Sequence, residues 1–350
     1  MHNNNKCIPL DKLIYKALYD QKYGFYMKKN PFGAGGDFIT SPNISVLFSE
    51  MLAVWTIDFW GKLKFPKKFN LIELGPGNGE MILQMIKSFK NFPNFQKSCK
   101  INIFEKSPFL KKIQKKKLKQ YDVKWIKNLN EIKDGPNIFI ANEFFDALPI
   151  KQFFKIKKKW TERYVDLANK NDIKFVSKDI DINKLENKIG IKISKNQKII
   201  EYSPKSHEYL RNISKNLISK NGGLLIIDYG SSDILMSNTL QSLKKHRKNN
   251  ILTNVGSADI TYKINFKLFE KISKRLKLKS QGITSQKKFL TNMGILKRAE
   301  IITKNMPFSK KADVYFRLKR LIDENQMGNL FKFMLITNKN INFKTGFELD

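Results

Sequence analysis

The stretch Glu73-Leu74-Gly75-Pro76-Gly77-Asn78-Gly79 decides the fold of this chain, because it joins two segments with different hydrophobic periods. Phe69 to Leu74, before the glycines, is a short apolar run that predicts a buried strand. Met81 to Phe89, after them, has its apolar residues on one face of a helix. Glycines between a strand and a helix let the backbone approach a ligand closely, and the helix offers free N–H groups. This junction therefore predicts either a ligand-binding loop or a tight structural turn.

Three further apolar runs continue the same pattern on both sides of that loop. They are Ile101 to Phe104, Ile138 to Ala141 and Gly223 to Ile227, and a polar residue follows each of them. Helical segments separate the runs, which predicts an α/β fold with a parallel sheet covered by helices on both faces. Ligands in such sheets bind beyond the carboxyl ends of the strands.

The rest of the chain divides around this α/β core. We expect a helical N-terminal segment with a glycine-rich loop over residues 1–66, and a core over residues 67–335. Alternating apolar and charged residues at about 151–202 predict an antiparallel β insertion. A second insertion, at about 231–266, is rich in loop-forming residues, and residues 336–350 are expected to be a tail.

The glycine spacing bears on the kind of cofactor. A dinucleotide fingerprint has a third glycine at the position that Glu80 occupies here. An acid at the positive end of a helix would face a pyrophosphate unfavourably. S-adenosylmethionine fits better, because it needs close backbone approach and an acid can accept hydrogen bonds from its ammonium group. Glu105 ends the second predicted strand, where a carboxylate can accept hydrogen bonds from both hydroxyl groups of a ribose. Alternatively, Glu105 is an ordinary carboxylate at the end of a strand and binds no ligand.

The segment Asn142 to Pro149 follows another strand and is the candidate catalytic stretch. Its carboxylates, Glu143 and Asp146, could hold a cationic acceptor such as a guanidinium by charge-assisted hydrogen bonds. Alternatively, Asn142 or Asp146 caps a helix and Glu143 is merely solvated. Enzymes that methylate the amino groups of bases typically carry a proline pair here. This stretch has none, which disfavours direct base methylation.

Composition excludes several other classes of protein. The net charge is +35, but only seven of the 66 basic residues are arginine, so we interpret the excess as a solvated lysine coat and expect no dedicated nucleic-acid surface. Two cysteines and three histidines exclude a disulfide scaffold and a zinc module, so no metal site is expected. The most apolar stretch, residues 44–60, is interrupted by acids and predicts no membrane span.

Many ordered stretches of this chain resemble the MidA/NDUFAF-seven group of class I methyltransferases, a complex I assembly factor and its bacterial relatives. The resemblance runs from Leu10 to about Leu335. The matching stretches are Tyr23 to Met27, Gly36 to Pro42, Glu73 to Gly79, Asn142 to Pro149, Asp228 to Gly230, Ala258 to Thr261, Gln286 with Phe289 and Leu290, Asn292 to Ile295, and Met327 with Gly328. Six positions depart from the group: Asn43 replaces a usual glutamate, Ser49 a usual glycine, Asn78 a common arginine, Asn128 a common aspartate, and Lys263 and Asn265 a common histidine and aspartate.

The resemblance implies a Rossmann-like methyltransferase that uses S-adenosylmethionine and dimethylates an arginine in a core subunit of respiratory complex I. The acceptor would be oriented by Glu143 and Asp146, with Asp228 and Tyr229 as weaker candidates. The group's cofactor site would map to Gly36 and Thr40 in a closing loop, to Gly75, Gly77 and Gly79, to Glu105, to Asn128 and Leu129 beside the adenine, and to Asn142.

Composition further suggests a bacterial cytoplasm, whereas eukaryotic relatives work in the mitochondrial matrix. Two other functions stay open at this stage. One is an assembly chaperone that binds the cofactor without turnover, and the other is an RNA-directed methyltransferase that uses the lysine coat. The oligomeric state is not indicated by the sequence.

Overall fold

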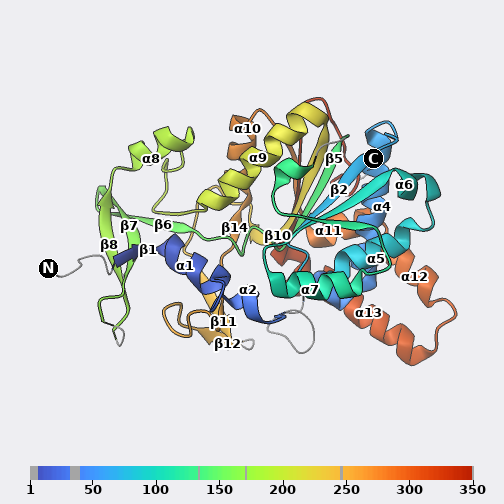
Figure 1. The fold of residues 1–350 in the computed structure, drawn as a ribbon, viewed down its shortest axis with the longest axis horizontal. Helices are drawn as coiled ribbons and strands as arrows, with labels where there is room; N and C mark the ends of the chain where they lie inside the picture. The colour runs from blue at the N-terminus through green and yellow to red at the C-terminus, as the bar shows by residue number, and fades with distance from the viewer. Residues whose placement is uncertain (1–6, 32–39, 133–134, 170–171, 245–246, 349–350) are drawn as a thin grey trace.

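A computed structural model describes residues 7–31, 40–132, 135–169, 172–244 and 247–348 (Figure 1). The centre of the fold is an eight-stranded mixed sheet. Its strands are, in spatial order, β15 (Lys279–Ser285), β16 (Phe331–Thr337), β10 (Gly222–Ser231), β5 (Asn137–Asn142), β2 (Phe69–Leu74), β3 (Cys99–Phe104) and β4 (Val123–Ile126), with the short β14 (Ile264–Asn265) beside the end of β10.

The five strands from β10 to β4 are parallel to one another, as the sequence predicts. On the other edge, β16 runs antiparallel to β10, and β15 runs antiparallel to β16. Because the parallel strands share one direction, the residues that follow β2, β3, β5 and β10 meet at one edge of the sheet. The predicted α/β fold with a Rossmann-like core is therefore confirmed.

Side chains of the central strands alternate between two apolar cores, one on each face of the sheet. In β2, Ile72 and Leu74 enter the first core, and Phe69 and Leu71 enter the second. The first core is covered by α1 (Leu10–Tyr19), α9 (Pro204–Lys220) and α10 (Phe266–Arg275). The second is covered by α4 (Val46–Lys62), α5 (Glu80–Phe89), α6 (Pro93–Ser98), α11 (Gln286–Asn292), α12 (Ile295–Thr303) and α13 (Phe308–Ile322).

A five-stranded antiparallel sheet forms over the first predicted insertion. It contains β6 (Lys151–Ile156), β7 (Lys159–Asp166), β8 (Lys174–Ile180) and β9 (Ile199–Tyr202). Its remaining strand, β1 (Cys7–Pro9), pairs with β7 and comes from the N-terminal segment, whose other described elements are helices. The insertion also contains a helix, α8 (Ile182–Ile189), that the period-two pattern did not indicate.

The second insertion forms a small sheet of its own. The strands β11 (Gln241–Lys244), β12 (Arg247–Asn249) and β13 (Asp259–Thr261) pair antiparallel in the order β12-β11-β13. They are short and largely polar, which is why the sequence indicated only loops. The last of them, β13, lies against α1, so this insertion reaches the edge of the main sheet where the parallel strands end.

Residues 336–350, expected as a tail, pack onto the core as far as the structure describes them. Thr337 still belongs to β16, and Phe343 and Phe347 beyond it are buried. The ring of Phe343 packs edge-on against Trp55, and that of Phe347 packs against Phe289. These contacts close the second core, so the last described residues contribute to the stability of the fold.

The described residues contain neither a candidate membrane-spanning helix nor a candidate metal-binding cluster. No helix there has the length and apolar character required to cross a bilayer. No group of three or more His, Cys, Asp or Glu side chains is arranged to hold a metal ion. Cys7 and Cys99 are both free thiols.

Candidate functional site

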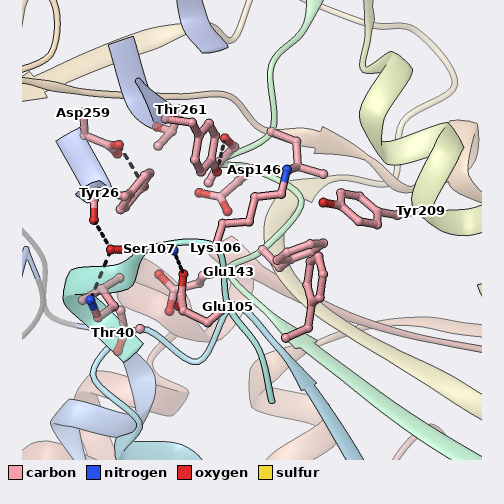
Figure 2. Close-up of a pocket in the computed structure, with 18 of the residues that line it drawn as sticks. Tyr26, Thr40, Glu105, Lys106, Ser107, Glu143, Asp146, Tyr209, Asp259 and Thr261 are labelled. Carbon is pink, nitrogen blue, oxygen red and sulfur yellow. Dashed lines mark hydrogen bonds between the residues drawn. The ribbon is translucent and has the colours of Figure 1, made fainter. Parts of the chain in front are cut away.

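A cavity of about 850 Å³, partly open to solvent, lies beyond the carboxyl ends of β2, β3, β5 and β10 (Figure 2). A smaller pocket adjoins it and shares Thr40, Gly75, Gly77 and Glu143 with it. Although the chain has a net charge of +35, the described lining of the large cavity contains four carboxylates, four tyrosines and one lysine: Glu105, Glu143, Asp146, Asp259, Tyr19, Tyr26, Tyr209, Tyr229 and Lys106.

The glycine loop forms one wall of the cavity. Gly75 and Gly77 have φ angles of +64° and +55°, a region of backbone conformation that side chains disfavour. A Cβ atom on Gly75 would lie 2.9 Å from the ring of Phe144. The N–H of Gly75 donates to the carbonyl of Phe104, 2.9 Å away, which ties the loop to the end of β3. The loop is thus a fixed backbone wall with no side chain of its own at Gly75 or Gly77.

Glu105 lies in the floor of the cavity and is only 8% exposed. One carboxylate oxygen accepts from the N–H of Ser107 at 2.8 Å, and the other accepts from the amide of Gln114 at 3.1 Å. The same Gln114 amide donates to the carbonyl of Gly77, so the carboxylate and the glycine loop are held by one side chain. Burial raises the pKa of Glu105, and these hydrogen bonds oppose the shift. An oriented carboxylate of this kind can accept hydrogen bonds from the hydroxyl groups of a ligand.

Two buried acceptor atoms near the glycine loop have no hydrogen-bond partner: Oε2 of Glu73 and Oδ1 of Asn142. Both residues line the smaller pocket. Burial, together with the negative charge of Glu105, raises the pKa of Glu73 to about 8. Because unpaired buried acceptors are costly, the site is suited to a ligand that brings donors, such as an ammonium group. An amino-acid-bearing cofactor therefore fits the residues present.

Glu80, the acid that the sequence suggested for the ammonium group, is already engaged. Its carboxylate accepts from the ammonium group of Lys117 at 2.6 Å and from the amide of Gln84 at 2.7 Å. Although it lines the smaller pocket, these partners hold the pKa of Glu80 below its usual value despite partial burial. Glu73 is thus the better candidate for the ammonium group.

Two of the residues that depart from the resembled group, Asn43 and Asn78, contact each other. The Asn78 amide donates to Oδ1 of Asn43 at 3.1 Å, and the Asn43 amide donates to the hydroxyl of Thr40 at 2.7 Å. A neutral amide pair thus stands where the group commonly carries an acid and a base. It still links the glycine loop to the segment that contains Thr40, which lines both pockets.

Glu143 follows β5 in a left-handed conformation, with φ at +49°. Its N–H donates to the carbonyl of Ile227 at 2.9 Å, which fixes the turn against β10. Its carboxylate accepts from the Asn142 amide at 3.3 Å and from the N–H of Ser41. Burial and the neighbouring Asp146 raise the pKa of Glu143 to about 8. A strained non-glycine residue at a cavity wall is typical of functional sites.

Asp146 is 5% exposed, and its Oδ1 atom has no hydrogen-bond partner (Figure 2). Burial raises its pKa to about 6, while a hydrogen bond from Tyr229 opposes the shift. Asp228 does not line the cavity. Its Oδ2 atom accepts from the N–H groups of Phe145 and Asp146 at 3.1 and 3.2 Å, so it positions the turn that carries Asp146.

The opposite wall comes from the N-terminal segment and the second insertion (Figure 2). The hydroxyl of Tyr26, in α2 (Phe25–Lys28), donates to Asp259 of β13 at 2.9 Å, and Ser107 donates to the Tyr26 carbonyl at 2.7 Å. The hydroxyl of Tyr19 donates to the carbonyl of Ala147 at 3.0 Å. Sequence reasoning assigned no role to these residues, although Tyr26 and Asp259 lie in stretches that carry the family resemblance.

The structure brings most of the predicted site residues together. Thr40, Gly75, Gly77, Glu105, Glu143 and Asp146 line the large cavity, and Asn142 lines the smaller pocket. Gly79 lines neither and begins α5 with φ at +75°.

The two residues expected beside the adenine also lie outside both linings. Asn128 is exposed and caps a short 3₁₀ helix, η1 (Leu129–Glu131), whereas Leu129 is buried in the first core. Gly36 lies outside the described residues. The roles of Asn128, Leu129 and Gly36 stay predictions.

Known proteins resemble this chain over nearly its whole length. It is 29% identical over 357 residues to the Xenopus laevis protein named "Protein arginine methyltransferase NDUFAF7, mitochondrial", which covers 94% of this chain and 80% of that protein. The Homo sapiens protein of the same name is 26% identical over 356 residues, with the same coverage.

Solved structures share the fold. A COG1565 superfamily member from Burkholderia thailandensis, bound to S-adenosyl-homocysteine, superposes with a TM-score of 0.81 at 21% identity, covering 98% of this chain and 89% of that one. The native crystal structure of a COG1565 superfamily protein from the same organism gives a TM-score of 0.82 at 21% identity, covering 98% of this chain and 90% of that one. These likenesses independently support the α/β architecture described above.

The sequence profile of one family, Methyltransf_28, matches residues 51–284, about two thirds of the chain. Its description is "Putative S-adenosyl-L-methionine-dependent methyltransferase". The match covers the glycine loop, Glu105, the segment after β5 and the small sheet that carries Asp259. The chain therefore belongs to this family of S-adenosyl-L-methionine-dependent methyltransferases.

Proposed function

We propose that this protein transfers methyl groups from S-adenosylmethionine to an arginine of a protein, and that the acceptor is a core subunit of respiratory complex I. The observation that supports this most is the acidic cavity in a strongly basic chain: four carboxylates and one lysine in the described lining, against a net charge of +35. Such a cavity favours cations, and arginine is always cationic. The curated relatives named as protein arginine methyltransferases support the same reading.

Within this proposal, the cofactor lies against the glycine loop. Glu105 holds the ribose hydroxyls. Glu73 and Asn142 accept hydrogen bonds from the ammonium group, since both residues line the smaller pocket and each has a buried acceptor atom without a partner. When bound, the cofactor supplies an electrophilic methyl group on a sulfonium centre. Gly75 and Gly77 leave room for it, because neither carries a side chain.

The acceptor side of the cavity is formed by Glu143, Asp146, Asp259 and the surrounding tyrosines. A guanidinium group presents several N–H donors in one plane, and buried carboxylates are its best partners. The unpartnered Oδ1 of Asp146 is available for such a donor. Tyrosine rings around it exclude water and pack against the planar cation.

Methylation of a guanidinium nitrogen requires a proton to leave that nitrogen, because its lone pair is delocalised until then. Glu143 lies within the same cavity, and burial has raised its pKa to about 8. A carboxyl group with a pKa close to the working pH is well matched to accept and release a proton. We therefore assign proton removal to Glu143 and orientation of the guanidinium to Asp146.

The test is a transfer assay with S-adenosylmethionine that carries a labelled methyl group. Lysate from a strain that lacks the gene serves as acceptor, with complex I assembly intermediates added. The wild-type protein is compared with Glu143→Gln and with Glu80→Gln, an acid of the same edge that Lys117 already holds. We expect label in one protein band with the wild type and with Glu80→Gln, and none with Glu143→Gln.

The remaining outcomes distinguish the alternatives. Label in RNA would contradict a protein acceptor and support the RNA-directed enzyme. Cofactor binding with no label from any acceptor, and a Glu143→Gln variant that still supports complex I assembly, would support a chaperone without turnover. The bacterial cytoplasm suggested by composition belongs to the same proposal and is tested by fractionation of the source cells.

A further inference from the structure

The helical hairpin formed by α12 and α13 exposes an unusual concentration of apolar side chains. Nineteen large apolar side chains are exposed among the described residues, and six of them lie between residues 296 and 316. The most exposed are Phe308 at 86% and Phe316 at 72%. The others are Leu296, Ile301, Met306 and Tyr315. Scattered exposed apolar residues are normal, but a cluster marks an interaction surface.

The hairpin is firmly attached to the body on its other side. Leu318 and Leu321 of α13 are buried in the second core. The guanidinium of Arg317 donates to the carbonyl of Ile44 at 3.2 Å, and the Gln286 side chain donates to the carbonyl of Leu321 at 2.9 Å. The apolar residues at the tip are thus presented by a fixed helix.

Spacing places the exposed aromatic residues on one face of α13. Phe308, Tyr315 and Phe316 are separated by seven and eight residues, which is two helical turns. The buried Leu318 and Leu321 point elsewhere, roughly 140–160° around the helix axis from Phe316. Figure 1 shows α13 and its connection to α12 extending away from the central sheet at the lower right. The exposed apolar stripe is therefore on a projecting, convex part of the molecule.

The same hairpin is strongly basic. Residues 295–322 contain eight lysines and arginines and two acids, Glu300 and Asp313. Both acids are paired within the hairpin, with Lys297 and Arg317. Lys304, Lys310 and Lys311, which flank Phe308, form no ion pair with any residue that the structure describes. Exposed aromatic residues are thus surrounded by uncompensated positive charge.

We propose that the α12–α13 hairpin docks the protein on an anionic lipid surface, with Phe308 and Phe316 inserted among the headgroups and Lys304, Lys310 and Lys311 on the lipid phosphates. Apolar residues combined with lysines are the combination that binds such surfaces. A second copy of this chain is disfavoured, because two hairpins of the same positive charge repel each other. A lipid surface also accepts a convex apolar tip without a complementary groove.

Hydrogen bonds connect the attached side of this hairpin to the methyltransferase site through α3 (Ser41–Ile44). α3 receives the hydrogen bond from Arg317 at Ile44, and Ser41 at its start hydrogen-bonds Gln286 at 3.3 Å. The same helix adjoins Thr40, which lines both pockets. Lipid binding by the hairpin does not depend on which acceptor is methylated.

The experiment is sedimentation of the full chain with vesicles of phosphatidylcholine, with and without phosphatidylglycerol. We expect binding to the anionic vesicles only. Phe308→Ser with Phe316→Ser should weaken it by about tenfold or more, and so should Lys304→Gln with Lys310→Gln and Lys311→Gln. The matched control is Ile234→Ser with Leu235→Ser, two exposed apolar residues, 69% and 59% exposed, on another part of the chain. This control should bind like the wild type.

Three results would overturn the proposal. The first is no binding to anionic vesicles. The second is equal loss of binding in the Ile234 and Leu235 control, which would assign the binding to surface residues in general. The third is a dimer in sedimentation equilibrium that the Phe308 and Phe316 variant abolishes, which would make a second copy the occupant. Unchanged thermal melting of each variant shows that the fold is retained, since all these side chains are exposed.

Discussion

Asp228 accepts a hydrogen bond from the backbone N–H of Asp146 at 3.2 Å, so a residue outside the cavity fixes one that lines it. Asp228 is fully buried and also accepts from the N–H of Phe145 at 3.1 Å and from its neighbour Tyr229 at 3.0 Å. The edge of β10 therefore determines where the carboxylate of Asp146 points. We therefore assign Asp228 a positioning role, and the proposed contact with the acceptor to Asp146.

Replacing Asp228 with Asn should separate catalysis from cofactor binding. The amide group would direct N–H donors at backbone N–H groups, so the turn at Asp146 would shift. We expect kcat to fall by about tenfold or more, and the free energy of unfolding to fall by about 1–3 kcal/mol. The cofactor Kd, measured by calorimetry, should change little. Asp181→Asn, at an exposed helix cap on the exterior, is the matched control. An unchanged kcat in Asp228→Asn would show that the turn does not depend on this carboxylate.

Glu73→Gln should weaken cofactor binding, whereas Glu80→Gln should not. Glu73 lines the smaller pocket and has a buried oxygen with no hydrogen-bond partner, whereas Glu80 is held by Lys117 and Gln84. Loss of a charge-assisted hydrogen bond to an ammonium group is worth about tenfold or more in Kd. Calorimetry with S-adenosylmethionine measures both variants. Equal affinity in Glu73→Gln and the wild type would assign the ammonium group to other acceptors.

The same variant should change how stability depends on pH. Burial raises the pKa of Glu73 from 4.5 to about 8, so across this window the folded state holds a proton that the unfolded state has released. The wild type therefore loses stability as pH rises from 4.5 to 8, by about 1.4 kcal/mol for each unit between the two pKa values. Glu73→Gln does not titrate, so its stability relative to the wild type should increase with pH. Urea unfolding at several pH values measures this difference, and a constant difference would contradict the raised pKa.

Gly75→Ala tests the glycine wall. Its φ angle is +64°, and the new Cβ atom would lie 2.9 Å from the Phe144 ring. Gly294→Ala is the control, because its φ angle is +81° but nothing lies within 4 Å of its Cβ position. Both variants should lose about 1 kcal/mol of stability from the backbone alone. Only Gly75→Ala should lose further stability and bind the cofactor more weakly, as melting curves and calorimetry would show. Equal stability and equal cofactor affinity in the two variants would show that the close approach of Phe144 to Gly75 does not matter.

Local pattern was enough to predict the centre of the fold. The strand from Phe69 to Leu74 has the predicted bounds. The strand at Ile138 is one residue longer at each end than predicted, and the strand at Gly223 begins one residue earlier and ends four residues later, at Ser231. These strands are buried on both faces, so they read as apolar runs with glycine or polar residues at their ends. Because the strands of the core are predicted to be parallel, the residues that follow them, Glu105, Glu143 and Asp146, are predicted to lie at one edge of the sheet.

The cavity wall that contains Tyr26 and Asp259 could not be predicted from the hydrophobic pattern of the sequence. Tyr26 and Asp259 are 233 residues apart, and they meet because the small sheet of the second insertion packs against α1. Such long-range contacts leave no periodic signal in a short window of sequence. The strand at Cys7 escaped detection for a similar reason, since its three residues are defined by their pairing with β7.

The most direct test of the central claim is the chemical identity of the methylated product. The protein band labelled by the wild-type enzyme would be hydrolysed in acid, and the labelled amino acid identified by chromatography and mass spectrometry. The account predicts dimethylarginine, absent when Glu143→Gln replaces the wild type. Label recovered as methyl-lysine or as a methyl ester would contradict the assignment of the acidic cavity to a guanidinium.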